Sequence, residues 1–221
     1  MESKDVFLNK LLKIHQYYQS VSSHMKEYAF PTSFKDEKGV FIPNDLIVFY
    51  DLVVNGIIQI SEFSSQFNPK DRKVLGAGSG DGRELAVASL FGFLAYGIEL
   101  DKGLVDISNK ACQDLYKKKI IKEKFNVVQG TFNKDEPYGE LGINFSDLDY
   151  IIHSMNNTDS FTNLLKKFSE ESKDNAKLFL LAEPITIVNL KKKVEKYNLS
   201  ISKPYPTRAR TGLQRDYAII S

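Results

Sequence analysis

The sequence is poor in the residues that build disulfides and metal sites: its 221 residues include one cysteine and three histidines. Because Cys112 has no second cysteine to pair with, neither an intramolecular disulfide nor a thiolate metal site can form. The histidines lie too far apart along the chain to suggest a shared ion, so we expect no metal. They are His15, His24 and His153.

Long hydrophobic runs and a strong excess of one charge are also missing. Asp51, Asn55 and Gln59 interrupt the most apolar stretch, residues 46–60, which excludes a membrane span there. The formal net charge of +2 is too small to predict a nucleic-acid partner from the field of the whole protein. The first residues lack the basic-then-apolar order of a signal peptide, so we expect a cytoplasmic protein with no membrane partner.

The remaining composition is that of an ordinary globular protein, with 42% hydrophobic, 26% charged and 12% aromatic residues. This length is enough for one α/β core and too short for two full domains with a linker. We therefore expect an N-terminal helical extension at residues 1–42 and a single domain at residues 43–221.

Short apolar runs and segments of helical periodicity alternate along the chain. The expected strands are 73–75, 93–100, 125–129, 148–153, 177–182, 199–203 and 216–220. One or two helices are expected within 5–29, and further helices at 45–63, 83–92, 103–119, 160–172 and 185–197. This alternation indicates βαβ units, hence a doubly wound, mainly parallel sheet of seven strands. The last two strands leave no room for a helix between them, which predicts an antiparallel hairpin.

Residues 74–83, Val-Leu-Gly-Ala-Gly-Ser-Gly-Asp-Gly-Arg, place four alternating glycines between a buried strand and a helix. Such a turn lets the backbone approach a ligand closely, beside the positive N-terminus of the helix. A dinucleotide fingerprint needs Gly or Ala at its sixth position, which is Asp81 counted from Gly76 and Arg83 counted from Gly78. A phosphate-binding P-loop needs Gly-Lys-Ser/Thr, which is absent. The pattern favours a nucleoside with a sulfonium tail and no pyrophosphate.

Residues 43–221 resemble the class I S-adenosylmethionine-dependent methyltransferases, a family with a Rossmann-like fold. The glycine loop matches the first motif of the family, and Glu99, one βα unit after it, matches the acidic residue that binds both ribose hydroxyls. The resemblance implies S-adenosylmethionine as cofactor and methyl transfer as activity. It also implies a set of cofactor contacts: Gly76, Ala77, Gly78, Ser79, Gly80, Glu99, Leu100, Thr131, Phe132 and Ser154.

Two positions depart from the family pattern. The family usually carries Asp or Glu at the position of Gly76, where the carboxylate helps to orient the methionine ammonium. Its third motif often contains Gly-Asp, whereas this chain has Gly130-Thr131 followed by Phe132. Thr131 can still form a hydrogen bond, and Phe132 can lie against the adenine. The aromatic residues within 1–42 suggest the further hypothesis that this extension covers the cofactor.

The acceptor pocket is expected beyond the carboxyl end of the strand at 148–153. His153 is a candidate base there, and Asn156 and Asn157 follow it in a polar segment. An ordinary loop with a helix cap explains the same residues equally well. Positioning and charge complementarity supply most of the acceleration of methyl transfer, so no catalytic dyad is required.

A narrower resemblance concerns the acceptor. Phe41-Ile42-Pro43, Gly80 to Arg83 and Gly97-Ile98-Glu99 are similar to segments of small archaeal and mitochondrial protein-lysine methyltransferases, which favours a protein lysine or another amine. An RNA or a small metabolite is the alternative acceptor. A non-catalytic interaction module is a third hypothesis, motivated by the missing acid at Gly76. Three arginines fit either a solvated turn or contacts with RNA phosphates or an acidic peptide: Arg208, Arg210 and Arg215.

Overall fold

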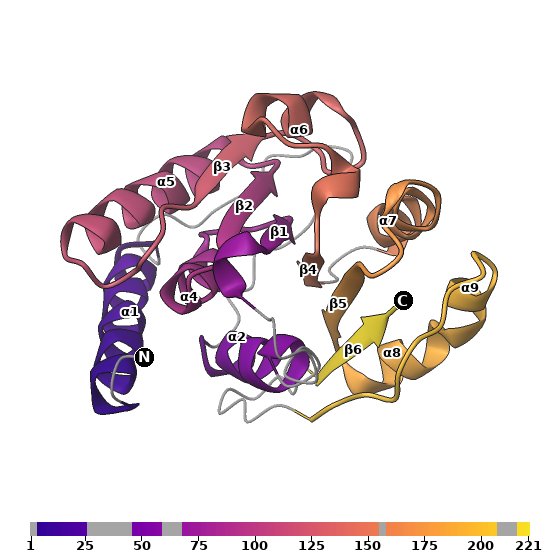
Figure 1. Cartoon of the computed structure of the whole chain (residues 1–221), viewed down its shortest axis with the longest axis horizontal. Coiled ribbons are helices and arrows are strands. Elements are labelled where there is room, and N and C mark those ends of the chain that lie inside the picture. Colours follow the sequence, from indigo (N-terminus) through magenta and orange to yellow (C-terminus); the bar gives the residue numbers. More distant parts are fainter. Residues whose placement is uncertain (1–3, 26–45, 59–67, 155–157, 207–215) are drawn as a thin grey trace.

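The computed structural model describes residues 4–25, 46–58, 68–154, 158–206 and 216–221. A twisted sheet runs through the centre of the molecule with helices on both sides (Figure 1). The sheet has six strands in the order β3-β2-β1-β4-β5-β6. They are β1 (Lys73–Ala77), β2 (Leu94–Glu99), β3 (Asn126–Gln129), β4 (Tyr150–Ser154), β5 (Lys177–Ala182) and β6 (Asp216–Ile220).

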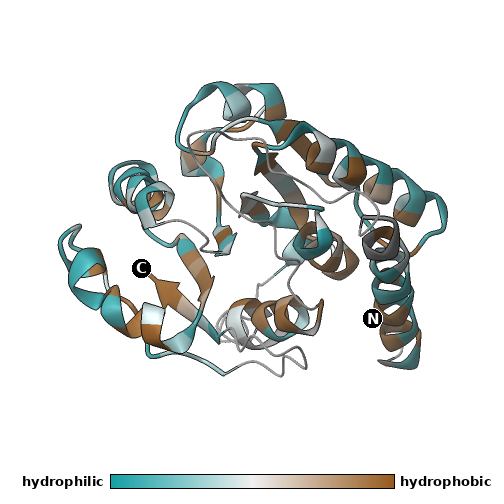
Figure 2. Ribbon diagram, turned by 180° about the vertical axis from the view of Figure 1, so that it is seen from behind, coloured by the Kyte–Doolittle hydropathy of each residue, from teal (hydrophilic) through white to brown (hydrophobic). Residues whose placement is uncertain are grey.

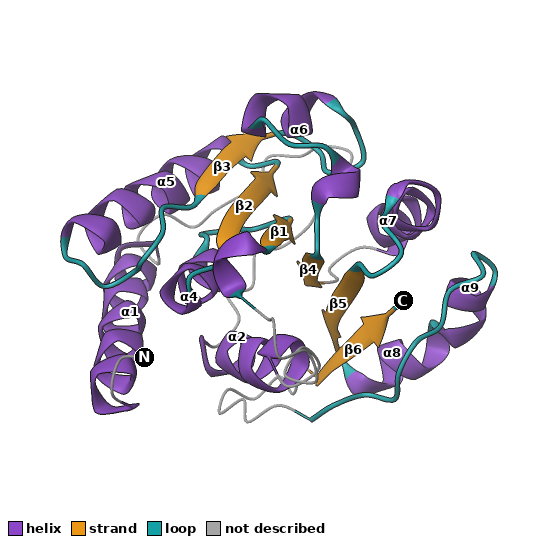
Figure 3. Cartoon of the chain, viewed as in Figure 1, coloured by secondary structure: helices purple, strands orange, loops and turns teal. Residues whose placement is uncertain are grey.

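The helices form two layers, one on each face of the sheet (Figure 3). One layer contains α1 (Lys4–Met25), α2 (Leu46–Asp51), α4 (Arg83–Phe91) and α5 (Lys102–Lys117), which share one hydrophobic cluster. The other contains α6 (Glu136–Leu141), α7 (Thr158–Glu171), α8 (Pro184–Asn189) and α9 (Lys191–Glu195), which share a second cluster. Among the described helices, none has the length and apolar character needed to cross a bilayer.

Strands β1 to β5 are parallel, and both faces of the sheet are buried. Successive residues Val74 and Leu75 of β1 face opposite clusters, and both are fully buried. Figure 2 shows the consequence, with hydrophobic strands at the centre and hydrophilic outer surfaces on the helices. This arrangement confirms the predicted mainly parallel α/β sheet.

The prediction of seven strands is wrong for the described sheet, in which residues 199–203 form no strand. Residues 200–205 do run antiparallel to β6, with hydrogen bonds between Ser200 and Ser221 and between Tyr205 and Tyr217. Between these pairs the Ser202 hydroxyl accepts the N–H of Ile219. Pro204 also lacks an N–H to donate, so only isolated bridges remain. β6 itself pairs antiparallel with β5, so the antiparallel pair of the described sheet joins β6 to β5 and not to a strand at residues 199–203 as predicted.

Several helix boundaries differ from expectation. The predicted helix 185–197 is divided at Leu190 into α8 and α9, and the helix predicted from residue 160 begins at Thr158. Helix α6 was not expected, because six residues that include a proline and a glycine carry little periodicity. Of the predicted helix 45–63, the structure describes α2 and a π-helical segment, Leu52–Ile58. Its remainder, and residues 41–43, lie outside the described residues.

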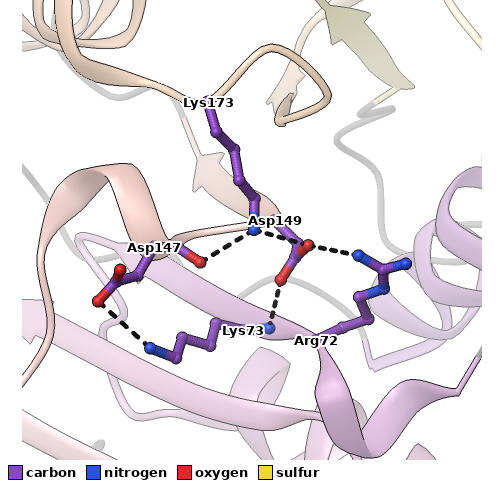
Figure 4. A network of polar contacts seen from close by, with 5 residues as sticks. All are labelled: Arg72, Lys73, Asp147, Asp149 and Lys173. Carbon is purple, nitrogen blue, oxygen red and sulfur yellow. Dashed lines mark hydrogen bonds and ion pairs between the residues drawn. The ribbon is translucent and has the colours of Figure 1, made fainter.

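A cluster of charged residues joins the amino-terminal ends of β1 and β4 (Figure 4). The buried Asp149 carboxylate accepts hydrogen bonds from the backbone N–H of Lys73 and from Nη1 of Arg72, both at 2.9 Å. It also forms an ion pair of 2.8 Å with Nζ of Lys173. The Lys73 ammonium donates to Asp147 at 3.3 Å. This cluster fixes the two central strands at the edge of the sheet opposite to the glycine loop.

Candidate functional site

The glycine loop leaves the carboxyl end of β1 and runs directly into α4. Gly78, Gly80 and Gly82 have φ angles of 76°, 54° and 80°, a region that favours glycine. At Gly82 space excludes a side chain as well, because a Cβ atom there would lie 2.0 Å from Oγ of Ser108. The N–H of Gly78 donates to the carbonyl of Ile98 at 2.9 Å, which holds the loop against β2.

The Glu99 carboxylate lies directly beside this loop at the end of β2. Its Oε2 accepts the N–H of Gly80 at 2.8 Å, and its Oε1 accepts the N–H of Asp101 at 3.0 Å. Burial raises the pKa of Glu99 above its usual value, and these backbone hydrogen bonds oppose the rise. A carboxylate has more lone pairs than these backbone donors occupy, so Glu99 can still accept a hydroxyl donor from a ligand.

The end of β3 closes the same edge of the sheet. The N–H of Gly130 donates to the main-chain oxygen of Glu99 at 2.9 Å, and the half-buried Thr131 follows it. The buried Phe132 is held by its carbonyl, which accepts the hydroxyl of Tyr138 at 2.7 Å. Its Cε1 atom lies 3.7 Å from the point where a Cβ on Gly78 would be. The aromatic ring is therefore close to the glycine loop.

His153 comes from β4 and contacts the base of the loop. Its Nδ1 lies 2.7 Å from the carbonyl oxygen of Ala77, which can only accept, so Nδ1 carries the proton. The imidazole contacts the rings of Phe132 and Phe161, whose centroids are 5.2 Å and 5.9 Å away. Burial lowers the pKa of His153 to about 4. The ring is therefore neutral at pH 7 and leaves Nε2 as an acceptor.

The structure adds charged residues to which sequence reasoning gave no role. The Asp81 carboxylate, 1% exposed, accepts hydrogen bonds from Nε of Arg83 at 2.9 Å and 3.1 Å and also pairs with Nη2. The Arg83 guanidinium carbon lies 5.3 Å from the ring centroid of Tyr18 in α1. The charged Asp-Gly-Arg run directly after the loop could have indicated the pair of Asp81 and Arg83. Nothing in the sequence indicates the contact between Arg83 and α1.

The parallel register gathers most of the predicted site residues at one edge. Gly76 of β1 lies beside Gly97 of β2 and Ile152 of β4, so the residues that follow these positions lie near one another. Gly76 itself lies beneath the loop and faces α4. Leu100 and Ser154 are half-buried at the same edge. Asn156 and Asn157 lie outside the described residues.

Two buried polar atoms at this edge have no hydrogen-bond partner among the described residues: Oγ of Ser79 and Nε2 of His153. Buried polar atoms are normally paired, so their presence fits a site that is completed by a ligand. Together with Glu99 and the backbone of the glycine loop, they offer mainly acceptors. The chemistry of this edge therefore suits a ligand rich in hydrogen-bond donors.

Comparison with solved structures identifies the architecture. The magnesium protoporphyrin IX methyltransferase from Synechocystis PCC 6803, solved with bound S-adenosylmethionine, superimposes with a TM-score of 0.57. The alignment covers 96% of each chain at 14% sequence identity. The chain has the fold of the class I methyltransferases. No family model and no curated protein matches its sequence.

Other methyltransferases share this fold. The m1A22 tRNA methyltransferase from B. subtilis has a TM-score of 0.53 at 13% identity, over 71% of this chain and 62% of its own length. The present chain thus spans less than two thirds of that protein. A TehB-like S-adenosylmethionine-dependent methyltransferase from Corynebacterium glutamicum has a TM-score of 0.51 at 18% identity, over 78% and 93% of the two chains.

Proposed function

We propose that this chain is an S-adenosylmethionine-dependent methyltransferase, with the donor bound at the edge that carries the glycine loop. The observation that carries the proposal is the hydrogen bond from the Gly80 N–H to the Glu99 carboxylate, at 2.8 Å. It sets an acceptor for two ribose hydroxyls beside a loop whose backbone permits close approach. The methyltransferase fold supports the same assignment.

Each predicted contact has a place in this proposal. The backbone from Gly76 to Gly80 encloses the methionyl part, Glu99 binds the ribose hydroxyls, and Leu100 packs beside them. Thr131 and Phe132 hold the adenine, and Ser154 borders the methyl group. In the same proposal residues 43–221 form the catalytic domain and residues 1–42 its N-terminal extension.

When bound, the donor would supply a methyl group on a sulfonium: an acceptor lone pair would bond to the methyl carbon as the S–CH3 bond breaks in line, and S-adenosylhomocysteine would be the leaving group. The chain contributes position and charge rather than covalent chemistry. The neutral His153 directs an Nε2 lone pair that can accept a hydrogen bond from an acceptor amine or hydroxyl. Its pKa of about 4 makes it a weak base, so we assign it to orienting the acceptor.

We propose a protein lysine or another amine as the first candidate acceptor, supported by the resemblance to small protein-lysine methyltransferases. The test is transfer of labelled methyl groups to purified proteins and, in parallel, to RNA. Labelled lysine in the protein digest supports the amine acceptor. Label confined to RNA or to a small metabolite favours the alternative.

One observation favours RNA as a second candidate acceptor. The charged residues that line a groove of about 990 Å³ at the carboxyl end of α5 are six lysines and one glutamate. A concentration of like charge is relieved by a polyanion, and an RNA backbone supplies one. The groove lies at the amino-terminal ends of β1 and β3, whereas the glycine loop lies at the carboxyl end of β1. An acceptor that contacts both must therefore be large, as an RNA is. Its lysines are Lys10, Lys70, Lys117, Lys119, Lys122 and Lys124.

The groove can be tested by charge removal with a matched control. We expect the triple change of Lys117, Lys119 and Lys122 to Gln to weaken RNA binding and to flatten its salt dependence by about 0.7 in log–log slope per lost phosphate contact. The control changes three exposed lysines elsewhere to Gln: Lys191, Lys192 and Lys196. Equal losses in both triple variants leave the groove without a specific role.

The central experiment is calorimetric titration of the full chain with S-adenosylmethionine and S-adenosylhomocysteine. We expect binding that Glu99→Ala weakens at least tenfold, about 1.4 kcal/mol. Glu136→Ala, which removes an exposed carboxylate from another helix, serves as the control. Absence of binding by the unaltered protein contradicts the proposed function and leaves a non-catalytic interaction module as the better account.

A further inference from the structure

Glu84 is a buried carboxylate in the first turn of α4, directly after the glycine loop. The residue is 7% exposed. Among the described residues no other side chain donates a hydrogen bond to it, and no lysine or arginine forms an ion pair with it. Burial raises its pKa well above the usual range, opposed by a hydrogen bond from its own backbone N–H. A buried carboxylate in this situation is costly to the fold.

The Glu84 carboxyl occupies the volume that a side chain at Gly76 would need. A Cβ atom on Gly76 would lie 2.8 Å from Oε1 of Glu84 and 2.9 Å from Cβ of Ser79. Position 76 can therefore hold only glycine while Glu84 keeps this conformation. The carboxylate that the family places on β1 is missing here, and a carboxylate from α4 lies beside the same position.

The three carboxyl groups around the loop are unequally paired among the described residues. Three carboxylates lie at or beside the loop, on Asp81, Glu84 and Glu99, and the described cation among them is Arg83. Asp81 binds the Arg83 guanidinium through several contacts. Glu99 receives two backbone N–H groups. Glu84 is therefore the carboxyl group with no hydrogen bond or ion pair from another described side chain, and Arg83 attracts its charge without contacting it.

A second buried group lies next to Glu84. The hydroxyl of Ser79, a residue 2% exposed, has no hydrogen-bond partner among the described residues. Because Ser79 Cβ and Glu84 Oε1 both lie within 3 Å of one point, the two side chains are neighbours beneath the loop. A carboxylate and a hydroxyl oxygen side by side are acceptors for a group with several N–H donors and a positive charge, which an alkylammonium is.

We propose that Glu84 binds the α-ammonium group of the methionyl tail of the donor, with the Ser79 hydroxyl as a second acceptor. This inference rests on the proposed function, since it assigns one group of the same ligand. It makes Glu84 a specificity residue: ligands that carry the amino-acid tail gain from it, and ligands that end at the thioether do not. It also explains why a costly buried carboxylate is kept at this position.

The test compares two ligands and two matched variants in the full chain. S-adenosylhomocysteine carries the ammonium, whereas 5′-methylthioadenosine has the same adenosine and thioether sulfur without the amino-acid tail. Glu84→Gln keeps the shape and removes the charge, and Glu136→Gln removes an exposed charge from the first turn of α6. We expect Glu84→Gln to weaken S-adenosylhomocysteine binding at least tenfold and to change 5′-methylthioadenosine binding less than twofold. Glu136→Gln should leave both unchanged.

The outcomes separate this inference from the proposed function. Binding of S-adenosylhomocysteine that Glu84→Gln leaves unchanged overturns the role of Glu84 and keeps the donor site. Equal weakening of both ligands also overturns it, because Glu84 then supports the loop and does not recognise the ammonium. A larger loss for S-adenosylmethionine than for S-adenosylhomocysteine assigns Glu84 to the sulfonium instead, against the inference. If the unaltered chain binds neither ligand, the proposed function itself fails.

A melting experiment checks that folding is not the cause of the loss. Since glutamine resembles the protonated carboxyl that burial favours, the ligand-free Glu84→Gln protein should melt no lower than the unaltered chain. The upward shift in melting temperature caused by saturating S-adenosylhomocysteine should shrink in this variant. A ligand-free protein that melts several degrees lower, with its ligand-induced shift intact, contradicts the inference.

Discussion

The Nδ1 atom of His153 donates to the carbonyl of Ala77 at 2.7 Å, so a side chain of β4 holds the last residue of β1, directly before the glycine loop. Any charge on this ring would be buried, since the residue is 5% exposed. The contact keeps the imidazole in one tautomer and leaves Nε2 directed away from Ala77. The position of the residue before the loop thus depends on a hydrogen bond from the neutral His153 ring.

The first prediction follows from the pKa of His153, which burial lowers from its usual 6.5 to about 4. Between these values the unfolded chain binds a proton and the folded chain does not. The stabilisation is therefore present above about pH 6.5 and is lost as the pH falls towards 4. We expect His153→Gln to lose less free energy of unfolding than the unaltered chain between pH 7 and pH 4.5, measured by urea denaturation. Equal losses in the two proteins contradict the buried, neutral ring.

Glu84 predicts a pH dependence of the opposite sign. Its folded-state pKa is raised, so its contribution is fully present below about pH 4.5 and is lost as the pH rises through the folded-state pKa. We expect the stability of Glu84→Gln, relative to the unaltered chain, to increase from pH 4.5 to pH 8. The comparison uses urea midpoints without ligand, and Glu136→Gln should show no such trend. A pH-independent difference for Glu84→Gln argues against a raised pKa.

The charged cluster at the opposite edge predicts a strong effect of Asp149. Its carboxylate, 8% exposed, forms ion pairs with Arg72 and Lys173 and accepts the backbone N–H of Lys73. Removing it leaves the Lys73 N–H without its acceptor and two cations without their carboxylate, although Lys173 still donates to the carbonyl of Asp147. We expect Asp149→Ala to cost about 2–4 kcal/mol of unfolding free energy.

The neighbouring Asp147 offers the control for that measurement. It is 37% exposed, pairs with the Lys73 ammonium at 3.3 Å and accepts the Asn144 N–H at 3.0 Å, so Asp147→Ala should cost about 1 kcal/mol. Chemical denaturation at pH 7 measures both variants. A cost for Asp149→Ala no larger than that for Asp147→Ala would falsify the assignment of the cluster to the joining of β1 and β4.

Tyr18 connects helix α1 to Arg83, which directly follows the glycine loop, and its burial predicts the effect of two substitutions on stability. The side chain is 1% exposed and contacts Arg83, while its hydroxyl has no hydrogen-bond partner among the described residues. Tyr18→Phe should be neutral or stabilising by up to about 1 kcal/mol, and Tyr18→Ala should cost about 3–5 kcal/mol. Thermal melting of the two variants provides the comparison.

Deletion of residues 1–30 extends that test to donor binding. Because Ile14 and Tyr18 belong to the same hydrophobic cluster as α4, we expect the truncated chain to melt lower and to bind S-adenosylhomocysteine more weakly. The comparison uses the same titration as for the full chain. Unchanged donor affinity rules out the hypothesis that this extension covers the cofactor.

The central strands could be predicted because their signals are local. Residues 177–182 and 216–220 were predicted with the bounds observed for β5 and β6, since buried strands of this kind are short apolar runs. The glycine loop was predicted for a similar reason, because positive φ angles require glycine. The assignments of Glu99, Thr131 and Phe132 to individual donor atoms stay predictions.

The features that sequence could not predict depend on contacts between distant residues. The irregular pairing of residues 199–203 with β6 follows in part from a side-chain hydrogen bond, from the Ile219 N–H to the Ser202 hydroxyl, and periodicity contains no trace of it. The neighbourhood of Gly76 and Glu84 likewise appears only when α4 is packed on β1. The sequence shows that Gly76 departs from the family pattern. It does not show that the Glu84 side chain occupies the space beside Gly76.

The order of the strands has a consequence for the folding pathway. β1, β2 and β3 follow one another through local crossovers, whereas β4 must find β1 across a sequence separation such as the 76 positions between Lys73 and Asp149. Closing so long a loop is entropically costly and slows folding. We therefore expect the β1–β3 unit to acquire protection from hydrogen exchange before the β4–β6 unit docks. The candidate site, which takes residues from both units, would then be assembled in the last step of folding.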